Sequence, residues 1–246
     1  MTNIAVFTFY PTLKAAAKTL AAKLGLPVKS NADYLLLLTP DYLGLQKTLG
    51  KSLPLYINFL SKRFQYRREN MSLRKEALVR ALGLKSHSEA RIVDATAGLA
   101  RDSFILAAFG FHVQMIERSP IIHALVKDGL ERASKNPDLL PIIKRMELIQ
   151  SDAAIWLKES KEKPDIIYLD PMFPERKKSA LSKLDMQIFH DIVGDDLDQD
   201  ELFKTALACA RKRVVVKRPR LARELSGIKP HHSLSGSSSR FDIYIT

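Results

Sequence analysis

The sequence predicts an α/β fold, in which a mostly parallel β-sheet with helices on both faces follows a small N-terminal α/β subdomain. From residue 71 onward, short β-branched runs alternate with segments of helical periodicity, as in strands joined by crossover helices. The chain has 246 residues and 46% hydrophobic content, enough to bury a substantial core, so fibrous and low-complexity classes are excluded. Several of the expected strands also end at an acidic residue.

The first 70 residues have the pattern of a small α/β subdomain. A β-branched and aromatic run opens it, and an Ala/Lys/Leu-rich segment with helical spacing follows, closed by Gly25 and Pro27. Two further apolar runs predict strands. The expected strands cover residues 4–9, 34–39 and 53–59, and the expected helix covers 13–24. We therefore predict a subdomain at 1–70 and a main domain at 71–246.

The main domain opens with a helix that Gly83 ends, and strands and helices then alternate. Pro120 stands at the first turn of one helix, where its missing N–H has no intrahelical partner to lose. The Ser/Gly-rich stretch 233–239 predicts a loop. The expected helices cover residues 72–82, 102–109, 120–134, 153–159 and 197–210. The expected strands cover residues 91–94, 112–117, 146–150, 165–169, 213–216 and 241–245.

Charged residues are unevenly distributed along the chain. Lys and Arg total 39 and Asp and Glu total 27, which gives a formal net charge of +12. Residues 61–85 hold eight basic and two acidic residues, and residues 211–223 hold seven basic and no acidic ones, whereas 191–201 holds six acidic and no basic ones. A single such cluster is also typical of a solvated helix face. Several in one chain favour nucleic acid over an anionic membrane as the partner.

Other functional classes find little support in the sequence. The longest apolar stretches, such as 34–38, are far shorter than the roughly 20 residues of a membrane-spanning helix. The N-terminal residues lack the pattern of a secretory signal, so we expect a cytoplasmic protein. Cys209 is the single cysteine, on an apolar helix face, and the six histidines lack metal-ligand spacing. We therefore expect no internal disulfide, no membrane span and no metal site.

Acidic residues at two neighbouring strand ends indicate an adenosine-type cofactor. Ligands of open parallel sheets bind beyond the carboxyl ends of the strands. Asp94 opens a small-residue turn that contains Gly98, and Glu117, which lies 23 residues after Asp94, ends the next strand. An acid about 20 residues after such a turn accepts hydrogen bonds from ribose hydroxyls. NAD and S-adenosylmethionine both carry a ribose, but the turn lacks the G-x-G-x-x-G pattern that binds a pyrophosphate, which favours S-adenosylmethionine.

Two more strand ends carry acidic residues. Asp152 is placed to accept from an adenine amino group or, equally, to cap the helix that follows. Asp170 is followed by Pro171 and Phe173, which form a rigid loop with exposed carbonyls after a buried strand. Such acceptors suit the exocyclic amine of guanine or adenine. Asp170 and the Pro171 carbonyl hold its two hydrogens, the lone pair turns toward an electrophilic methyl, and Phe173 stacks on the base. A proline-stiffened strand end with a buried Phe173 is the purely structural alternative.

Five segments of the main domain occur in a distinctive order, namely DATAGLARD, ERSP, YLDPMFPERKKSA, VVVKRP and RFDIYIT. From about residue 67 to the C-terminus the chain resembles the ribosomal RNA small subunit methyltransferase J family, which methylates guanine N2 in small-subunit (16S) rRNA. The resemblance implies a class I, Rossmann-like methyltransferase fold and S-adenosyl-L-methionine as cofactor. Ala100 stands where the family usually has glycine, and Asp152 where serine is common. The implied cofactor contacts are Arg101, Asp102, Glu117, Arg118, Asp152, Ala153 and Asp170.

Basic residues follow two of the strands and predict contacts with RNA phosphates. Parallel strands share one open edge, so both groups are expected to flank the target base. Phosphate contacts position the RNA without reading its sequence. Ordinary solvated loop charge is the alternative. The residues are Arg176, Lys177, Lys178, Lys217, Arg218 and Arg220.

Three alternatives to guanine-N2 methylation stay open. An adenine-N6 or other nucleic-acid amino methyltransferase needs the same acid-proline-aromatic loop, so only the family resemblance selects guanine and rRNA. A nicotinamide-dependent oxidoreductase shares the sheet and Glu117 but predicts the missing glycine pattern. A non-catalytic RNA-binding assembly factor leaves the strand-end acids unexplained. The expected partner is small-subunit rRNA or the ribosomal subunit.

Overall fold

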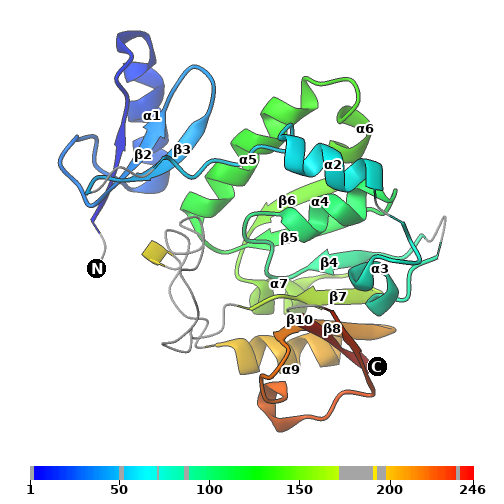
Figure 1. Cartoon of the computed structure of the whole chain (residues 1–246). Helices are drawn as coiled ribbons and strands as arrows, with labels where there is room; N and C mark the ends of the chain where they lie inside the picture. The colour runs from blue at the N-terminus through cyan, green and yellow to red at the C-terminus, as the bar shows by residue number, and fades with distance from the viewer. Residues whose placement is uncertain are drawn as a thin grey trace. The chain divides into compact units, whose positions relative to one another are not determined.

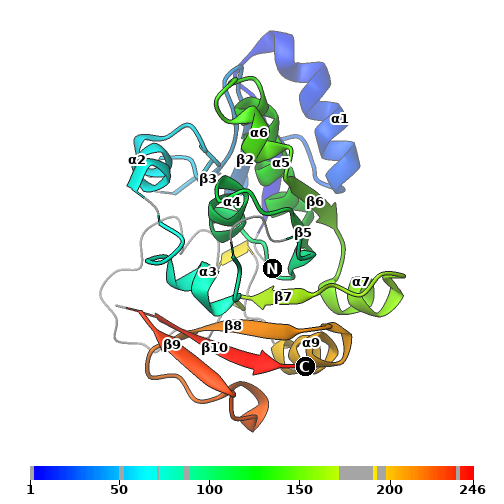
Figure 2. The same cartoon turned by 90° about the vertical axis from the view of Figure 1, so that its right-hand side faces the viewer.

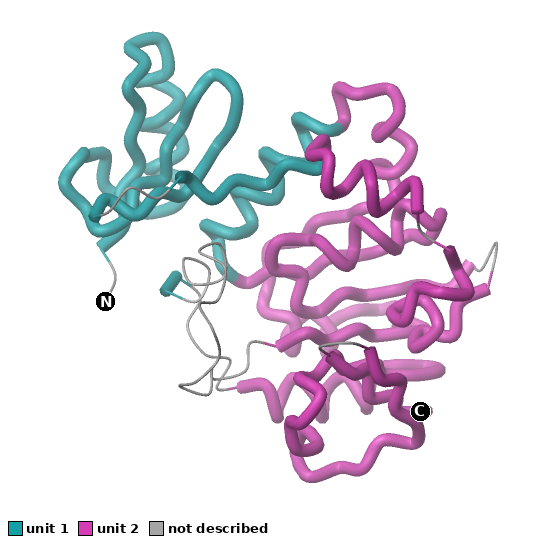
Figure 3. The backbone as a smooth tube through the Cα atoms, in the orientation of Figure 1, with its two compact units in different colours: residues 1–59, 119–133, 172–195 teal, residues 60–118, 134–171, 196–246 magenta. Residues whose placement is uncertain are grey.

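The computed structural model describes residues 3–49, 53–70, 72–85, 89–171, 191–192, 198–236 and 239–246. The chain forms two compact units, which are coloured separately in Figure 3. Unit 1 comprises residues 1–59, 119–133 and 172–195, and unit 2 comprises residues 60–118, 134–171 and 196–246. The division into domains at residue 70 stays a prediction.

Unit 1 contains a three-stranded sheet in the order β1-β2-β3 (Figure 1). β1 and β2 are parallel, whereas β2 and β3 are antiparallel. Gly25 ends α1 with a φ of +65°, a left-handed conformation that glycine adopts at little steric cost. The predictions for β1, α1, β2 and α5 are confirmed. The elements are β1 (Ile4–Phe7), η1 (Pro11–Leu13), α1 (Lys14–Leu24), β2 (Tyr34–Leu38), β3 (Leu43–Lys47) and most of α5 (Pro120–Ser134).

The strand predicted at 53–59 is wrong. Leu55 forms an isolated bridge with Leu45, and residues 53–59, all of which the structure describes, contribute no named strand. The third strand is β3 instead, whose sequence Leu-Gly-Leu-Gln-Lys gives only a weak strand signal. Leu55, Ile57 and Phe59 are nevertheless buried. Burial at alternate positions therefore imitates a strand here although the backbone makes no ladder.

Unit 2 is built on a seven-stranded sheet in the order β6-β5-β4-β7-β8-β10-β9. The pairs from β6 to β8 are parallel, whereas β10 runs antiparallel to both β8 and β9. The predicted mostly parallel sheet is thus confirmed. The loop predicted at 233–239 is partly wrong, because polar residues there form an edge strand. The strands are β4 (Ile92–Asp94), β5 (Val113–Glu117), β6 (Met146–Gln150), β7 (Ile166–Leu169), β8 (Arg213–Pro219), β9 (His232–Ser235) and β10 (Ser239–Ile245).

The helices of unit 2 follow the predicted alternation with some differences. The helix predicted at 72–82 is shorter, because residues 73–75 form a turn before it. Two further α-helices, α2 and α6, lie where we predicted none, and so does the short 3-10 helix η2. The helices are α2 (Lys62–Asn70), α3 (Ala77–Ala81), α4 (Arg101–Ala108), α6 (Leu140–Ile143), α7 (Ala153–Glu159), α9 (Gln199–Cys209) and the short η2 (Leu225–Gly227).

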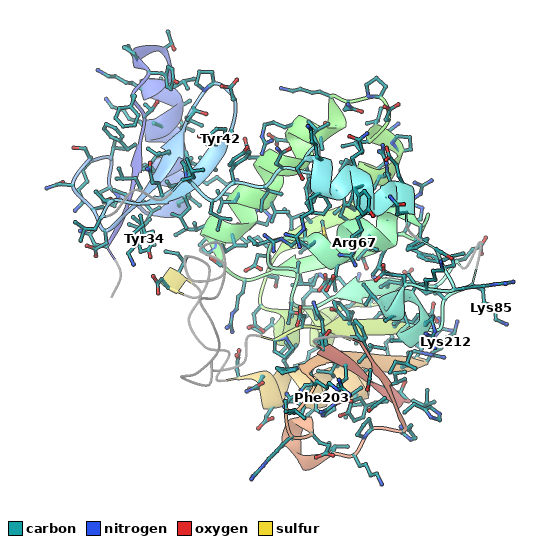
Figure 4. The ribbon with its side chains drawn as sticks, in the orientation of Figure 1. Tyr34, Tyr42, Arg67, Lys85, Phe203 and Lys212 are labelled. Carbon is teal, nitrogen blue, oxygen red and sulfur yellow. The ribbon has the colours of Figure 1, made fainter. Side chains whose placement is uncertain are left out.

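Helices cover both faces of the seven-stranded sheet, as predicted. On one face, Val93, Ile167 and Val214 share a core with residues of α7 and α9, including Phe203, which Figure 4 labels, and the buried Cys209. Successive strand residues point to opposite faces, so their neighbours in sequence face α4. The α4 face holds most of the polar groups described below.

The strand order places a topological switch point between β4 and β7. From β4 the chain proceeds outward through β5 to β6, and then returns to β7 and β8 on the other side of β4. Figure 2 shows β7, β8 and β10 side by side. The crevice beyond the carboxyl ends of β4 and β7 is where such sheets bind ligands. Among the residues that the structure describes, no helix is both long and apolar enough to cross a bilayer.

Candidate active site

The turn after β4 brings backbone to the carboxyl edge of the sheet. Gly98 and Ala100 both have positive φ, at +49° and +55°. The left-handed conformation is ordinary for glycine but strained for alanine. Ala100 begins α4, and its carbonyl accepts from the N–H of Phe104 at 3.0 Å. Arg101 and Asp102, two implied cofactor contacts, are the first residues of α4.

The side chain of Asp94 stabilises this turn through hydrogen bonds. Its side chain is buried, accepts from the Ser103 hydroxyl at 2.5 Å and from the Thr96 N–H at 3.2 Å. Burial raises the pKa of Asp94 to about 7, although both hydrogen bonds act to lower it. The Asp94 carboxyl therefore fixes the turn and α4 to the end of β4. Whether it also contacts a cofactor stays a prediction.

Glu117 lies where the sequence places it, at the end of β5 beside β4. Only 6% of the residue is exposed, and its Oε2 accepts from the N–H of Gly98 at 3.0 Å. The acid and the glycine turn that we linked by their spacing therefore meet in space. A carboxylate can accept several hydrogen bonds, so this contact is compatible with a ribose hydroxyl as a second donor.

Three other implied cofactor residues, Arg118, Asp152 and Ala153, follow β5 and β6. Asp152 caps α7, because its Oδ1 accepts from the Ile155 N–H at 3.0 Å, and Ala153 is the buried first residue of that helix. Of the two roles left open for Asp152, the structure thus shows the helix cap. Arg118 follows Glu117 and pairs with Asp198, with Nη1 at 2.9 Å from both carboxylate oxygens.

Four polar side chains form an ion-pair cluster at the ends of α4, β7 and β8. The Nζ of Lys217 lies 2.7 Å from Oδ2 of Asp170 and 2.8 Å from Oδ2 of Asp102. The hydroxyl of Tyr168 also donates to Asp102, at 2.7 Å. Asp170 is held through its backbone as well, because its N–H donates to the Thr96 hydroxyl at 2.6 Å. One ammonium thus bridges a predicted catalytic acid and an implied cofactor contact.

Within this cluster, opposite charges favour the ionised forms that burial disfavours. Burial disfavours the charged form of Asp102, but the charge and hydrogen bond of Lys217 and the hydrogen bond of Tyr168 lower the pKa of this carboxyl. Burial likewise disfavours the charged lysine, but Asp170 and Asp102 raise the pKa of Lys217 well above its ordinary value. The pKa of Tyr168 is raised by burial and by the neighbouring carboxylates. Asp102 is therefore ionised, Lys217 charged and Tyr168 neutral at physiological pH.

The predicted base-binding and phosphate-binding residues are only partly described. Pro171 is buried directly after Asp170. Phe173, Arg176, Lys177 and Lys178 lie outside the described residues.

The structure gives two of the remaining basic residues partners within the protein. Lys217 is paired as described above, and Arg218 is 7% exposed, with Nη2 donating to the carbonyl of Arg223. Burial lowers the pKa of Arg218, and the charge of Arg240 acts in the same direction. For both side chains the phosphate contact stays a prediction, which these internal contacts do not favour. Arg220 is exposed, so for it the phosphate contact stays a prediction.

A buried ion pair holds the turn that carries Arg220. Asp242 is fully buried and accepts from Nε of Arg240 at 2.9 Å, and the hydroxyl of Ser233 donates to it at 2.6 Å. Nη1 of Arg240 donates to the carbonyls of Arg220 and Ala222, at 2.9 and 2.7 Å. The backbone of this turn is therefore fixed from within, which leaves its exposed side chains to solvent.

The polar groups at this edge fit S-adenosylmethionine better than a dinucleotide. Asp94, Glu117 and Asp152 end successive parallel strands or follow them directly, and carboxylates accept from ribose hydroxyls and amino groups. Burial and the Gly98 contact place Glu117 against the turn. A dinucleotide needs free backbone N–H groups and the G-x-G-x-x-G turn for its pyrophosphate. Among the residues described, no group of three or more His, Cys, Asp or Glu is arranged to hold a metal ion.

Comparisons with known proteins agree with this geometry. The chain matches a family model described as "Putative SAM-dependent methyltransferase" over residues 19–246. A relative from Thioalkalivibrio sulfidiphilus, named ribosomal RNA small subunit methyltransferase J, is 45% identical over 251 residues, which cover 100% of this chain and 98% of the relative. A protein of the same name from Coxiella burnetii is 45% identical, covering 99% of this chain and 97% of the relative.

A solved structure extends the comparison to the fold. The crystal structure of a SAM-dependent methyltransferase from Neisseria gonorrhoeae matches with a TM-score of 0.77 and 34% identity, covering 98% of this chain and 95% of that one. The Rossmann-like methyltransferase fold and the family resemblance are thus confirmed. Because these matches extend along nearly the whole sequence, the chain belongs to the ribosomal RNA small subunit methyltransferase J family and is an S-adenosylmethionine-dependent methyltransferase.

Proposed function

We propose that this chain methylates the exocyclic N2 of a guanine in small-subunit rRNA, acting in the cytoplasm on the rRNA or on the ribosomal subunit. Relatives that are 45% identical over nearly the whole chain carry the name of a small-subunit rRNA methyltransferase. The net charge of +12 suits a polyanionic substrate. The single observation that carries the proposal is the position of Asp170, an acid at the switch point of the sheet that is fixed through both its backbone and its side chain.

The role of Asp170 follows from the chemistry of the substrate amine. The N2 lone pair of guanine is delocalised into the ring, so the nitrogen is a poor nucleophile. An acceptor that binds an N–H hydrogen lets the nitrogen turn its lone pair out of the ring plane. In the proposal, Asp170 binds one hydrogen, the Pro171 carbonyl binds the other, and Phe173 stacks on the base.

Proton and charge balance assign a second task to the same carboxylate. Bound S-adenosylmethionine supplies an electrophilic methyl group on a sulfonium. As N2 bonds to that methyl, the bond between the methyl and sulfur would break, its electron pair would stay on sulfur, and neutral S-adenosylhomocysteine would leave. N2 would acquire the positive charge and return to neutrality by losing a hydrogen as a proton. Asp170 holds that hydrogen and passes the proton to water. Glu117 and Asp152 are proposed to bind the ribose and the adenine on the other side of the turn.

An adenine-N6 methyltransferase is the alternative of the same chemical class, because an acid and a rigid carbonyl serve either amine. Mass mapping of modified nucleosides in small-subunit rRNA distinguishes the two. We expect rRNA from cells that lack this protein to lose one N2-methylguanosine, which returns when the wild-type chain is restored. Loss of an N6-methyladenosine, or an unchanged set of nucleosides, would refute the guanine assignment.

A further inference from the structure

We propose that Lys217 is a positioning residue for methyl transfer, whose ammonium orients the Asp170 carboxylate toward the substrate amine while Asp102 anchors the ammonium. The inference deepens the proposed function and rests on it, because it assumes that Asp170 receives the amine. It assigns to Lys217 a task at the reaction centre in place of the phosphate contact that the sequence predicts.

Two short contacts fix the position of the Lys217 ammonium. Nζ lies 2.7 Å from Asp170 and 2.8 Å from Asp102, distances typical of strong charge-assisted hydrogen bonds. The side chain is half-buried, and its stem belongs to β8, which pairs with β7 up to the register of Val216 with Leu169. The strand ladder therefore places Lys217 beside the first residue after β7, which is Asp170.

Two independent contacts then fix Asp170. Its backbone N–H is tied to Thr96 in the turn after β4, and its carboxylate is tied to β8 through Lys217. A catalytic acceptor must be held within a fraction of an ångström of its productive position. The backbone bond does not itself restrain the side-chain torsions of Asp170. The contact with Lys217 acts directly on the carboxylate and restrains them.

The charges around Lys217 allow a test that distinguishes positioning of Asp170 from simple neutralisation of the buried Asp102. Asp94, Asp102 and Asp170 lie close enough to affect one another electrostatically, and Tyr168 contacts Asp102. Among the described residues, Lys217 and Arg67, which Figure 4 labels on α2, are positive charges that lower the pKa of Asp102. If Lys217 served only to neutralise Asp102, removing both charges together would restore function. If it positions Asp170, the loss would persist.

The test compares Lys217→Met, Lys217→Arg, Asp102→Asn and the double variant Asp102→Asn/Lys217→Met. Lys212→Met is the matched control, because Lys212 lies just before the opposite end of β8 and pairs with Asp165 at 3.1 Å. Each protein is assayed for methyl transfer to small ribosomal subunits from cells that lack it, at saturating S-adenosylmethionine. Cofactor affinity and thermal stability are measured alongside, so that a folding defect is recognised.

We expect Lys217→Met to lower kcat by about 100-fold, the cost of a small misplacement of a reacting group. Lys217→Arg should recover part of the rate, and Lys212→Met should keep it. The double variant should still be slower than Asp102→Asn, but by a smaller factor than Lys217→Met is slower than wild type, because Lys217 and Asp102 are in contact and their effects are coupled. The acid limb of the kcat profile should also move to higher pH in Lys217→Met, because a carboxylate that loses a neighbouring cation is harder to ionise.

Three results would overturn the inference. They are a folded Lys217→Met that keeps the wild-type kcat, a double variant no slower than Asp102→Asn, and a decrease in kcat that Lys212→Met reproduces. If Lys217→Met fails to fold, Lys217→Arg and the double variant decide the question. Nucleoside analysis of the same reactions identifies the methylated base. Transfer to a base other than guanine would refute the proposed function, while the rate ratios would still judge Lys217.

Discussion

The acidic residues at the amino ends of the strands in the seven-stranded sheet (the amino edge) and those at the carboxyl ends (the carboxyl edge) are paired differently. At the amino edge, one acid, Asp165, accepts from the Arg91 N–H at 3.0 Å and pairs with the exposed Lys212 and, at 3.9 Å, Arg211. At the carboxyl edge, Asp102 and Asp170 share one half-buried lysine, Lys217, and the buried Asp94 accepts hydrogen bonds from Ser103 and Thr96 instead. At the amino edge one acid thus has two cationic partners, whereas at the carboxyl edge two acids share one. The proposed function assigns binding and reaction to the carboxyl edge, where these acids are held in fixed positions.

Removing the central acid of each edge should have the largest effect on this contrast. Asp170→Ala should lower kcat by at least about 100-fold with the fold kept, because it removes the acceptor of the amine hydrogen. Asp165→Ala should keep kcat within a few-fold of wild type and unfold at a lower temperature. Rate assays and thermal unfolding measure both. A folded Asp170→Ala at the wild-type rate would break the comparison.

The pH dependence of stability should differ in sign between the two edges. Burial raises the pKa of Asp94 to about 7, so the folded state binds a proton that the unfolded state releases above pH 4. Asp94 therefore makes stability fall between about pH 4 and 7, by up to about 1.4 kcal/mol per pH unit. Burial acts to raise the pKa of Asp165, but its hydrogen bonds to Arg91 and Lys212 lower it, so its contribution is present above about pH 4 and is lost as pH falls.

Urea unfolding of Asp94→Asn and Asp165→Asn from pH 3 to 8 measures the two contributions. Relative to wild type, Asp94→Asn should flatten the fall in the free energy of unfolding toward pH 7. Asp165→Asn should instead remove stability above pH 4. Equal pH profiles for the two variants would show that the edges do not differ in this respect.

Cofactor affinity should depend on the carboxyl edge alone. Glu117→Ala should weaken S-adenosylmethionine binding by about 1–3 kcal/mol, the usual range for a hydrogen bond to a charged group. Glu117→Gln keeps an oxygen for the Gly98 N–H and should lose less. Glu147→Ala, on the neighbouring strand β6, is the control, because this exposed acid pairs with Gln114. Calorimetry that finds the Glu117→Ala affinity unchanged would rule out the ribose contact.

The smallest expected difference between the two edges is in the salt dependence of RNA binding. Neutralising Arg220 and Arg223, exposed on the turn after β8, should flatten the salt dependence of RNA binding by about 0.7 slope units per lost phosphate contact. Neutralising Lys161 and Lys163, exposed before β7 at the amino edge, should leave the slope unchanged. A filter-binding salt titration compares the pairs. Equal slopes would return Arg220 to ordinary surface charge.

The sequence predicts the elements that have strong periodicity and misses those that lack it. The long helix α5 and the strands β5 to β7 have clear apolar patterns and lie where expected. The four-residue helix α6 is too short to show a period, and β9, His-Ser-Leu-Ser, is a polar edge strand that reads as a loop. The strand predicted at 53–59 fails because burial there does not come from a ladder.

Only part of the candidate site could likewise be predicted from the sequence. Acids at strand ends can be found from sequence, because parallel strands that end at Asp94 and Glu117, or just before Asp170, place these acids on one edge. The pairing of Lys217 with Asp170 cannot be found from the sequence, because it depends on the register of β7 with β8. Tyr168 carried a usable signal, since it lies two residues before Asp170 and therefore on the same face.

The most direct test of the central claim is label transfer by the two edge variants. Wild type, Asp170→Ala and Asp165→Ala receive S-adenosylmethionine with a deuterated methyl group and small subunits from cells lacking the protein, and the nucleosides are then analysed by mass. We predict labelled N2-methylguanosine from wild type and from Asp165→Ala, and almost none from Asp170→Ala. Equal labelling by all three proteins, or equal loss in both variants, would contradict the assignment of the chemistry to the carboxyl edge.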